Sequence, residues 1–465
     1  MRFIAAALLT GLAAAAPAFG ANEDSDLDRI PAQMPAETQQ PQVTPSKDVN
    51  YLSDALQVSG IRNGLAVPFP SPSPATWEDW LFLDTRDEWR LGDDWRLNYS
   101  GRLNIRTSNS IPFPTHENVR NDLRELFVEF QPTDTVWLEL GRVNIRNGVA
   151  LGFNPTDFFR PRTVIEPLTA DPSVLREDRL GTLMVTGQAL WHFGSITMAY
   201  APKVTTPTAI YGIRNEQSFD PGLDRTNAQD RFMIKTSLNL ADRFNPELLY
   251  YHAGNRTQFG ANLTTPVGRE TVAYLEWSGG TRSDLIADAF RYGQMTGTLP
   301  ASSTGLLPND ASARFMNDLS IGASYTTESK ITFNVEYHFH EAGLSSRDWS
   351  NWFNTSAALG VHPGVNSALW YLRNYAQDQQ EPVSRHAAFF RMDWQDAFIR
   401  DLNLTALATV NLQDASGFLQ ATAEYHLSRA WTIAALVSGT YGGRRSEYGS
   451  LPQEASVLLR ANRYF

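Results

Sequence analysis

Three side chains with the chemistry of a metal site or a catalytic base stand at alternate positions of one segment, KITFNVEYHFH (330–340). They are Glu336, His338 and His340. Side chains two residues apart in a strand share a face, so the carboxylate and both imidazoles would line up. Such a set suits a zinc ion or a general base. The alternative is a polar lining of a water-filled interior. The rest of the sequence favours this alternative, because it has no CxxC, Walker or GxSxG motif. We therefore predict no metal, no cofactor and no enzymatic activity.

Arginines form the second chemically distinctive group. Arg96, Arg102 and Arg106 share one face of GDDWRLNYSGRLNIRTSNS (92–110), and further arginines recur at alternate positions of the preceding segment, 81–91. A row of guanidinium groups concentrates and orients carboxylates or phosphates. The chain as a whole carries a net charge of −11, which disfavours a nucleic-acid partner.

A long strand is needed to position these side chains. In 92–110 the apolar set Trp95, Leu97, Tyr99, Leu103 and Ile105 alternates with the arginines. A period of two indicates a β-strand with one apolar and one polar face. The segment exceeds the roughly five or six residues usual in globular sheets.

The same alternation recurs as far as the last residue, giving seventeen segments joined alternately by short turns and long loops. Short turns on one side and long loops on the other are typical of outer-membrane barrels, whose strand number is even. An eighteenth strand is therefore expected within 52–68, with 16 strands as the alternative. We predict an all-β, transmembrane, antiparallel up-and-down barrel over 51–465. One long loop contains a segment with helical character, 366–380.

The N-terminus indicates export. Arg2 precedes an apolar run that ends in small residues, with Ala18 and Gly20 at the −3 and −1 positions of a cleavage site. We expect a cleaved signal peptide over 1–20; the alternative is a buried alanine-rich helix. Residues 21–50 are rich in Pro, Gln, Asp and Glu, which predicts a flexible periplasmic leader.

A barrel of about 18 strands is too wide for its own side chains to fill, so an aqueous channel is expected. By alternation, charges of both signs face this lumen. The predicted pore-lining residues are Arg86, Arg90, Arg96, Arg102, Arg106, Glu125, Glu129, Glu139, Arg391 and Asp393. The apolar face, with Trp95 near a turn, is expected to contact lipid.

The loop NGVALGFNPTDFFRPR (147–162) is rich in Phe, Gly and Pro. Two placements remain open. It folds into the lumen and narrows it, or it caps the barrel outside. In the first case the constriction would be formed by Asn154, Asp157, Arg160 and Arg162.

Two stretches resemble known families. A final strand closed by Phe465 resembles the C-terminal signature of Gram-negative outer-membrane proteins. The pattern GR-x-N-I-R…G-x-NP-x-D (141–157) resembles uncharacterised porin-like outer-membrane families and, more distantly, the alginate-export barrels. The latter resemblance implies an arginine-lined, loop-gated pore for an anionic polysaccharide. This sequence departs from it through its many acidic residues on the expected lumen face.

Two functions follow as hypotheses. The first is an outer-membrane channel for small hydrophilic, preferentially anionic, solutes. The second is a conduit of a polysaccharide or other export system, with a periplasmic partner bound through the leader. Both place the chain in the outer membrane, in contact with its lipid and lipopolysaccharide.

Overall fold

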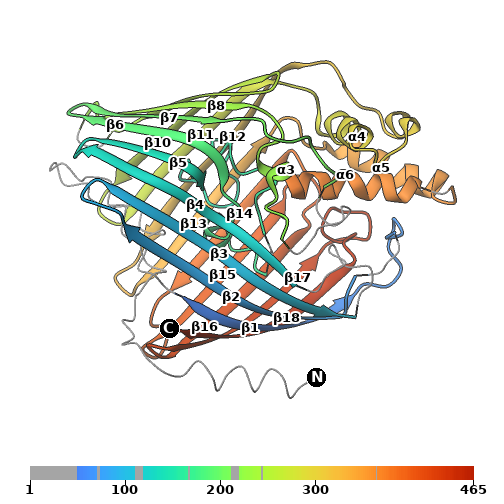
Figure 1. Cartoon of the computed structure of the whole chain (residues 1–465). Coiled ribbons are helices and arrows are strands. Elements are labelled where there is room, and N and C mark those ends of the chain that lie inside the picture. The colour runs from blue at the N-terminus through green and yellow to red at the C-terminus, as the bar shows by residue number, and fades with distance from the viewer. Residues whose placement is uncertain are drawn as a thin grey trace.

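The computed structural model describes residues 50–70, 74–109, 119–165, 168–210, 219–241, 244–362 and 364–465. The expected signal peptide and all but the last residue of the expected leader lie outside these ranges. Within them, eighteen strands form one antiparallel sheet closed into a barrel (Figure 1). The strands are β1 (Tyr51–Ile61), β2 (Trp77–Arg90), β3 (Trp95–Ser108), β4 (Val119–Thr133), β5 (Val136–Val143), β6 (Thr182–Trp191), β7 (Gly194–Ala201), β8 (Arg231–Leu238), β9 (Glu247–Ala253), β10 (Arg256–Val267), β11 (Thr271–Arg282), β12 (Arg314–Thr326), β13 (Ile331–His340), β14 (His386–Trp394), β15 (Leu402–Asn411), β16 (Gly417–Ser428), β17 (Trp431–Tyr441) and β18 (Gln453–Tyr464).

The first strand closes the sheet. β1 pairs with β18 from Tyr51 opposite Tyr464 onward, and with β2 from Tyr51 opposite Asp84. The prediction of 18 strands is thereby confirmed, and the alternative of 16 is wrong. β1 is hard to recognise in the sequence because Asp54 stands among the exposed, outward-facing residues Leu56 and Val58 and so breaks the alternation.

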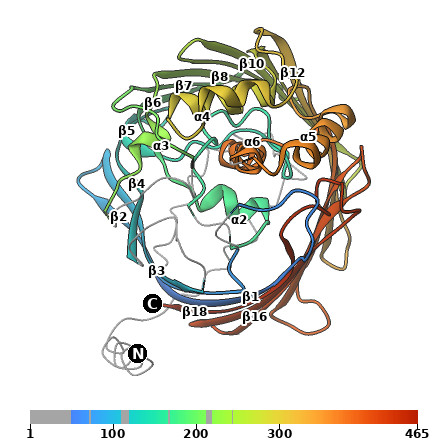
Figure 2. The ribbon, with the colours of Figure 1, turned by 90° about the vertical axis from the view of Figure 1, so that its right-hand side faces the viewer.

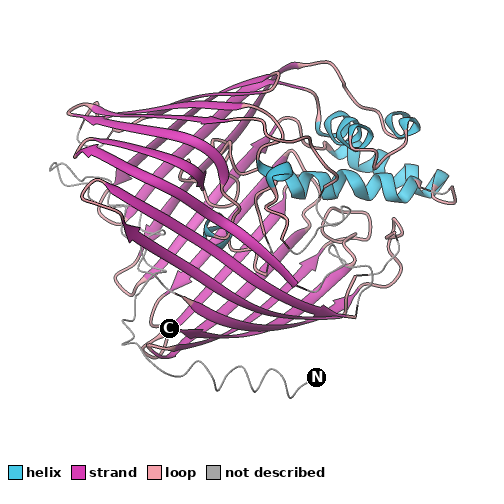
Figure 3. Cartoon of the chain, viewed as in Figure 1, coloured by secondary structure: helices cyan, strands magenta, loops and turns pink. Residues whose placement is uncertain are grey.

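The helices of the described residues are α2 (Pro172–Glu177), α3 (Leu223–Thr226), α4 (Leu285–Met295), the 3₁₀ turn η1 (Ala301–Gly305), α5 (Ser346–Leu359) and α6 (Val365–Gln379). The longer ones, α4, α5 and α6, lie at the long-loop end of the barrel (Figure 3). The predicted helical segment 366–380 is confirmed as α6. α5 begins at a capping box formed by Ser345 and Asp348, a local signal that the strand-based analysis missed. Among the described residues, no helix is long and apolar enough to cross a bilayer.

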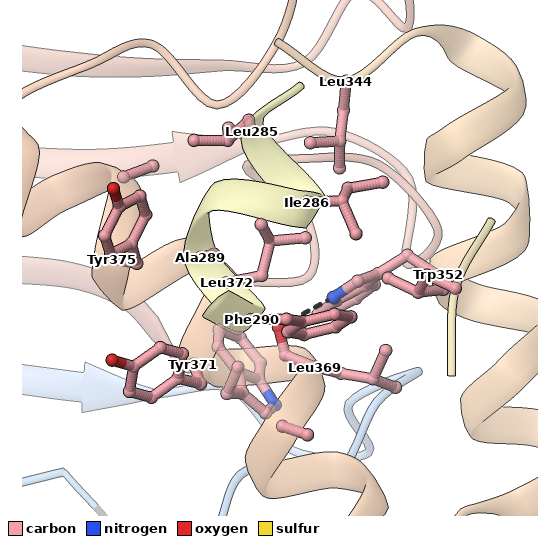
Figure 4. Packing of buried hydrophobic residues seen from close by; sticks show 14 of the residues in the cluster. Leu285, Ile286, Ala289, Phe290, Leu344, Trp352, Leu369, Tyr371, Leu372 and Tyr375 are labelled. Carbon is pink, nitrogen blue, oxygen red and sulfur yellow. Dashed lines mark hydrogen bonds between the residues drawn. The ribbon is translucent and has the colours of Figure 1, made fainter. Parts of the chain in front are cut away.

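A hydrophobic core joins α4, α5 and α6 into what we call the helical cap (Figure 4). Phe290, Trp352 and Leu369 are fully buried in it, and the Trp352 indole Nε1 donates to the Leu369 carbonyl oxygen at 2.9 Å. Burying one such side chain contributes about 1.5–3 kcal/mol. The Arg373 guanidinium lies over three tryptophan rings and donates to Ser450 Oγ at 2.9 Å. These contacts fasten α6 to the loop between β17 and β18.

The barrel wall separates an apolar outer face from a polar inner one, as the alternation predicts. On β3, Leu103 and Ile105 are each 38% exposed on the outside, whereas Arg102 and Asn104 are 4% and 5% exposed inside. Trp95 stacks on Phe130 of β4 at 4.2 Å between ring centroids, at the short-turn end of the barrel. Aromatic residues at a strand end suit the membrane interface.

Cysteine labelling checks this register directly, because the chain has no native cysteine. In Arg96→Cys the thiol will face water and react with a membrane-impermeant maleimide. In Leu103→Cys and Ile105→Cys it will face lipid or detergent and stay unlabelled. Labelling at 103 and 105 but not at 96 would contradict the register, since a one-residue slip exchanges the two faces.

An ion pair ties the end of α6 to the wall. The Arg282 guanidinium on β11 contacts both carboxylate oxygens of Glu381 at 2.9 Å. Burial alone would raise the pKa of Glu381, but Arg282 and the nearby His340 outweigh burial and lower it to about 2. The ordinary value in an unfolded chain is about 4.3.

The depressed pKa predicts the pH range in which this pair acts. Its stabilisation is fully present above the unfolded pKa and is lost as pH falls through the folded pKa. Glu381→Gln will therefore lower the melting temperature in detergent at pH 7, and its deficit relative to wild type will shrink between about pH 4 and 2. An equal deficit at both ends of this range, measured by heat-modified mobility, would contradict the assignment.

Candidate functional site

The connection between β5 and β6, residues 144–181, lies inside the barrel; we call it the inner loop. Its main-chain N–H groups at Leu151 and Gly152 donate to the Glu336 carboxylate on β13 at 2.7 and 2.9 Å. Ser320 on β12 donates to the Phe153 carbonyl oxygen. Figure 2, seen from the end that carries the helices, shows the strands as a ring around α2 of this loop.

Aromatic packing holds the first half of the inner loop against the wall. Phe153 lies edge-on to the imidazoles of His338 and His340, with centroids 6.0 and 5.9 Å away. Phe158 stacks on Tyr251 of β9 at 4.7 Å. Phe158 and its neighbour Phe159 are buried and, with residues of the wall, form one hydrophobic cluster. The apolar composition of the loop is thus accounted for by its place inside the barrel.

The second half of the inner loop is anchored on both sides of α2. Before α2, Asp171 accepts from Arg391 of β14 at 3.2 Å, and the main-chain N–H of Ala170 donates to Gln420 of β16 at 2.8 Å. After α2, Asp178 pairs with Arg102 of β3 and with Arg124 of β4. In the strand order β14 is next to β13, whereas β3 and β4 lie about half-way round the barrel, so the loop crosses the lumen along α2.

The four residues expected at a constriction hold the loop together. Asn154 donates to the Asn147 carbonyl oxygen at 2.6 Å, Asp157 pairs with Arg179 at 2.8 Å, and Arg162 pairs with Asp378 of α6 at 3.0 Å. All three are buried, and the Arg160 guanidinium lies over the Phe153 ring. Among the described residues of the loop, Arg146 and Glu177 have more exposed side chains, at 34% and 37%.

The predicted row of wall arginines is present, but three of them are paired with acids. Arg102 contacts Asp84 at 2.6 Å besides Asp178. Arg106 pairs with Glu78, and Arg96 contacts Glu129 at 3.0 Å and Glu88 at 3.8 Å. Arg86 is half-buried and Arg90 is exposed at the end of β2.

The predicted acids make comparable contacts along the wall. Glu125 accepts from the Asn144 main-chain N–H at 3.2 Å, Glu139 from the Thr186 hydroxyl at 2.8 Å, and Asp393 from the Thr405 hydroxyl at 3.0 Å. Arg391 and Glu129 are buried by the ion pairs already described. The sequence-predicted residues thus form short cross-strand networks on the inner wall.

A β-bulge hides one central residue from sequence analysis. Ser100 of β3 pairs with Glu125, but the next residue, Gly101, pairs with Leu123, so Arg124 is the additional residue. Arg124 is 2% exposed and contacts Asp84 at 2.7 Å and Asp178 at 3.2 Å. Alternation counted from Glu125 places Arg124 on the lipid side, and nothing in the local sequence signals the bulge.

His338 and His340 each face a carboxylate of the wall and also contact the inner loop. His338 Nε2 lies 2.7 Å from Glu336, and His340 Nδ1 lies 2.7 Å from Asp318. Within the described ranges, no three His, Asp or Glu side chains gather as a metal site. The imidazoles of His338 and His340 both lie against the Phe153 ring of the inner loop.

No protein-family model and no curated protein matches the chain, but solved structures match nine-tenths of it. OccK5 (OpdH) of Pseudomonas aeruginosa aligns with a TM-score of 0.50 at 11% identity, over 90% of this chain and 97% of that one. A BenF-like porin from Pseudomonas fluorescens Pf-5 gives 0.50 at 10%, over 90% and 98%. The chain has the fold of Gram-negative outer-membrane porins. Acinetobacter baumannii OccAB1 shares this porin fold, with a TM-score of 0.50 at 8% identity over 90% and 95%.

The bulge at Arg124 yields a stability prediction. Arg124→Ala removes a cation from the buried Asp84 and from the partly buried Asp178, and breaking a buried ion pair costs about 3–5 kcal/mol. Arg96→Ala is the matched control, because Arg96 is 32% exposed and such pairs contribute about 1 kcal/mol or less. Unfolding in urea, followed by tryptophan fluorescence, will show the larger loss for Arg124→Ala. Equal losses would mean that the bulge residue is not a central anchor.

Proposed function

We propose that this protein is an outer-membrane channel for small hydrophilic solutes, with the inner loop as its narrow section and with a preference for anions. The observation that carries the proposal is the combination of an 18-stranded barrel with a loop anchored on both sides of the lumen, at Glu336 of β13 and at Arg102 of β3. A barrel of this size leaves an aqueous interior that its wall side chains do not fill. A loop across that interior restricts what passes.

Basic side chains at the inner loop support the anion preference. Arg146 is partly exposed, and its nearest carboxylate in the described ranges, Glu177, lies 3.9 Å away. Arg176 donates to the carbonyl oxygens of Asn147 and Gly148. The wall residue Arg86, half-buried on β2, adds a further positive charge. Positive charge at a narrow aqueous section attracts anions more strongly than in open water.

Planar-bilayer recording tests both parts. The purified wild-type barrel will conduct steadily, and its reversal potential in a salt gradient will indicate anion preference. Arg86→Gln combined with Arg146→Gln will move that potential toward cation preference. Arg90→Gln is the control, because it removes the same charge from the same strand at its exposed end.

Arg102 and Arg106 are unsuited to this test, since their removal would also break the ion pairs that they make with the wall carboxylates Asp84 and Glu78. An unchanged reversal potential in the double variant would contradict the anion preference. A barrel that conducts only after a periplasmic protein is added would favour the export conduit instead.

A further inference from the structure

Four consecutive main-chain N–H groups of the inner loop donate to two wall carboxylates. Val149 and Ala150 donate to the same oxygen of Glu276, Oε1. Leu151 and Gly152 donate to the two separate oxygens of Glu336, Oε1 and Oε2. Glu276 and Glu336 lie on β11 and β13, on either side of β12. The loop tip is therefore bound through its backbone to side chains of the wall.

Both carboxylates are removed from water and depend on these donors. Glu276 is 0% and Glu336 is 2% exposed. Glu276 has no ion-pair partner in the described ranges, and its remaining contact, the Thr156 hydroxyl at 3.1 Å, also belongs to the loop. Glu336 accepts further from the Tyr274 hydroxyl at 2.6 Å and faces His338 at 2.7 Å. Since a buried charge without hydrogen bonds is costly, the loop and the two glutamates hold each other in place.

The loop backbone approaches these groups too closely for side chains. A Cβ at Gly148 would lie 2.5 Å from both Glu276 carboxylate oxygens, and one at Gly152 would lie 2.6 Å from the His338 ring. Gly148 also has φ +80°, which glycine adopts without strain. The two glycines thus permit the approach that the hydrogen bonds require.

We propose that Glu276 and Glu336 are positioning residues that hold the inner loop across the lumen and thereby set the width of the pore. This inference rests on the proposed channel function for its link to conductance. The hydrogen-bond arrangement itself makes a prediction that does not depend on that function. The two glutamates differ in how they bind the loop, so the same conservative substitution will affect them differently.

Glutamine offers one acceptor oxygen in place of the two of a glutamate. In Glu276→Gln the remaining amide oxygen can accept from both Val149 and Ala150, because the Thr156 hydroxyl can rotate to accept from the new amide group. Glu336→Gln has no such solution. Both oxygens of Glu336 accept from loop N–H groups, so one of these N–H groups will face an NH₂ group in the variant.

The test measures hydrogen exchange of the 149–152 amides and single-channel conductance of the full-length protein. Glu336→Gln will speed the exchange by about tenfold or more, as expected for loss of hydrogen bonds to a charged acceptor, and will raise the conductance. Glu276→Gln will change both measurements less than Glu336→Gln does, because one amide oxygen can still accept from Val149 and Ala150. Gly148→Ala provides a second variant, because the added Cβ pushes the loop away from Glu276 without changing any charge. Like Glu336→Gln, it will speed the exchange of the 149–152 amides and raise the conductance.

Several results would overturn the inference. Equal behaviour of the two glutamine variants would show that the carboxylate geometry does not position the loop. Unchanged exchange in Gly148→Ala would do the same, even if Glu336→Gln fails to fold. Faster exchange at constant conductance would show that the loop does not set pore width. If the wild-type barrel carries no current, the proposed channel function fails, and the exchange measurements still decide whether the glutamates hold the loop.

Discussion

Closure of the sheet is the constraint on which the rest of the structure depends. A strand edge left open in lipid would expose main-chain groups that no water can satisfy, so the first strand must find the last. β1 meets β18 along nearly its whole length and meets β2 on its other side. Eighteen strands closed in this way enclose more space than inward-facing side chains can occupy. The inner loop enters this space from the long-loop side of the wall.

A loop inside a barrel brings buried backbone and buried charge, and each must find a partner. The two halves of the inner loop meet this need in opposite ways. The first half presents N–H donors to a wall that carries carboxylates, Glu276 and Glu336. The second half carries the carboxylates Asp171 and Asp178, and the wall facing it carries arginines. Loop and wall are thus complementary in charge on both sides of the lumen.

Features that repeat along the chain could be predicted from the sequence. Alternation indicated the strands, and the lengths of the connections indicated their direction. The even number of strands in such barrels required one more strand, although the residues around Asp54 show little alternation. The two-residue alternation also predicted which face of β3 points inward. Features that break the repeat could not be predicted: the bulge at Arg124 reverses the parity of part of β4. The helical cap forms only because residues distant in sequence, such as Val67 and Phe290, meet in one core.

The candidate site shows a further limit of sequence analysis. The charged residues of the loop at 147–162 suggest a charged constriction, yet Asp157 and Arg162 are buried in ion pairs. A charged residue in a loop can be exposed to the water of the lumen or buried in an ion pair, and composition does not distinguish the two cases. The outcome depends on whether an oppositely charged side chain lies close by, which is set by the fold of the whole barrel. Arg146 and Glu177, by contrast, form only a long contact of 3.9 Å, and both side chains remain in contact with water. In this barrel most loop charges serve the fold, because fastening the loop to the wall and to α6 buries them in ion pairs.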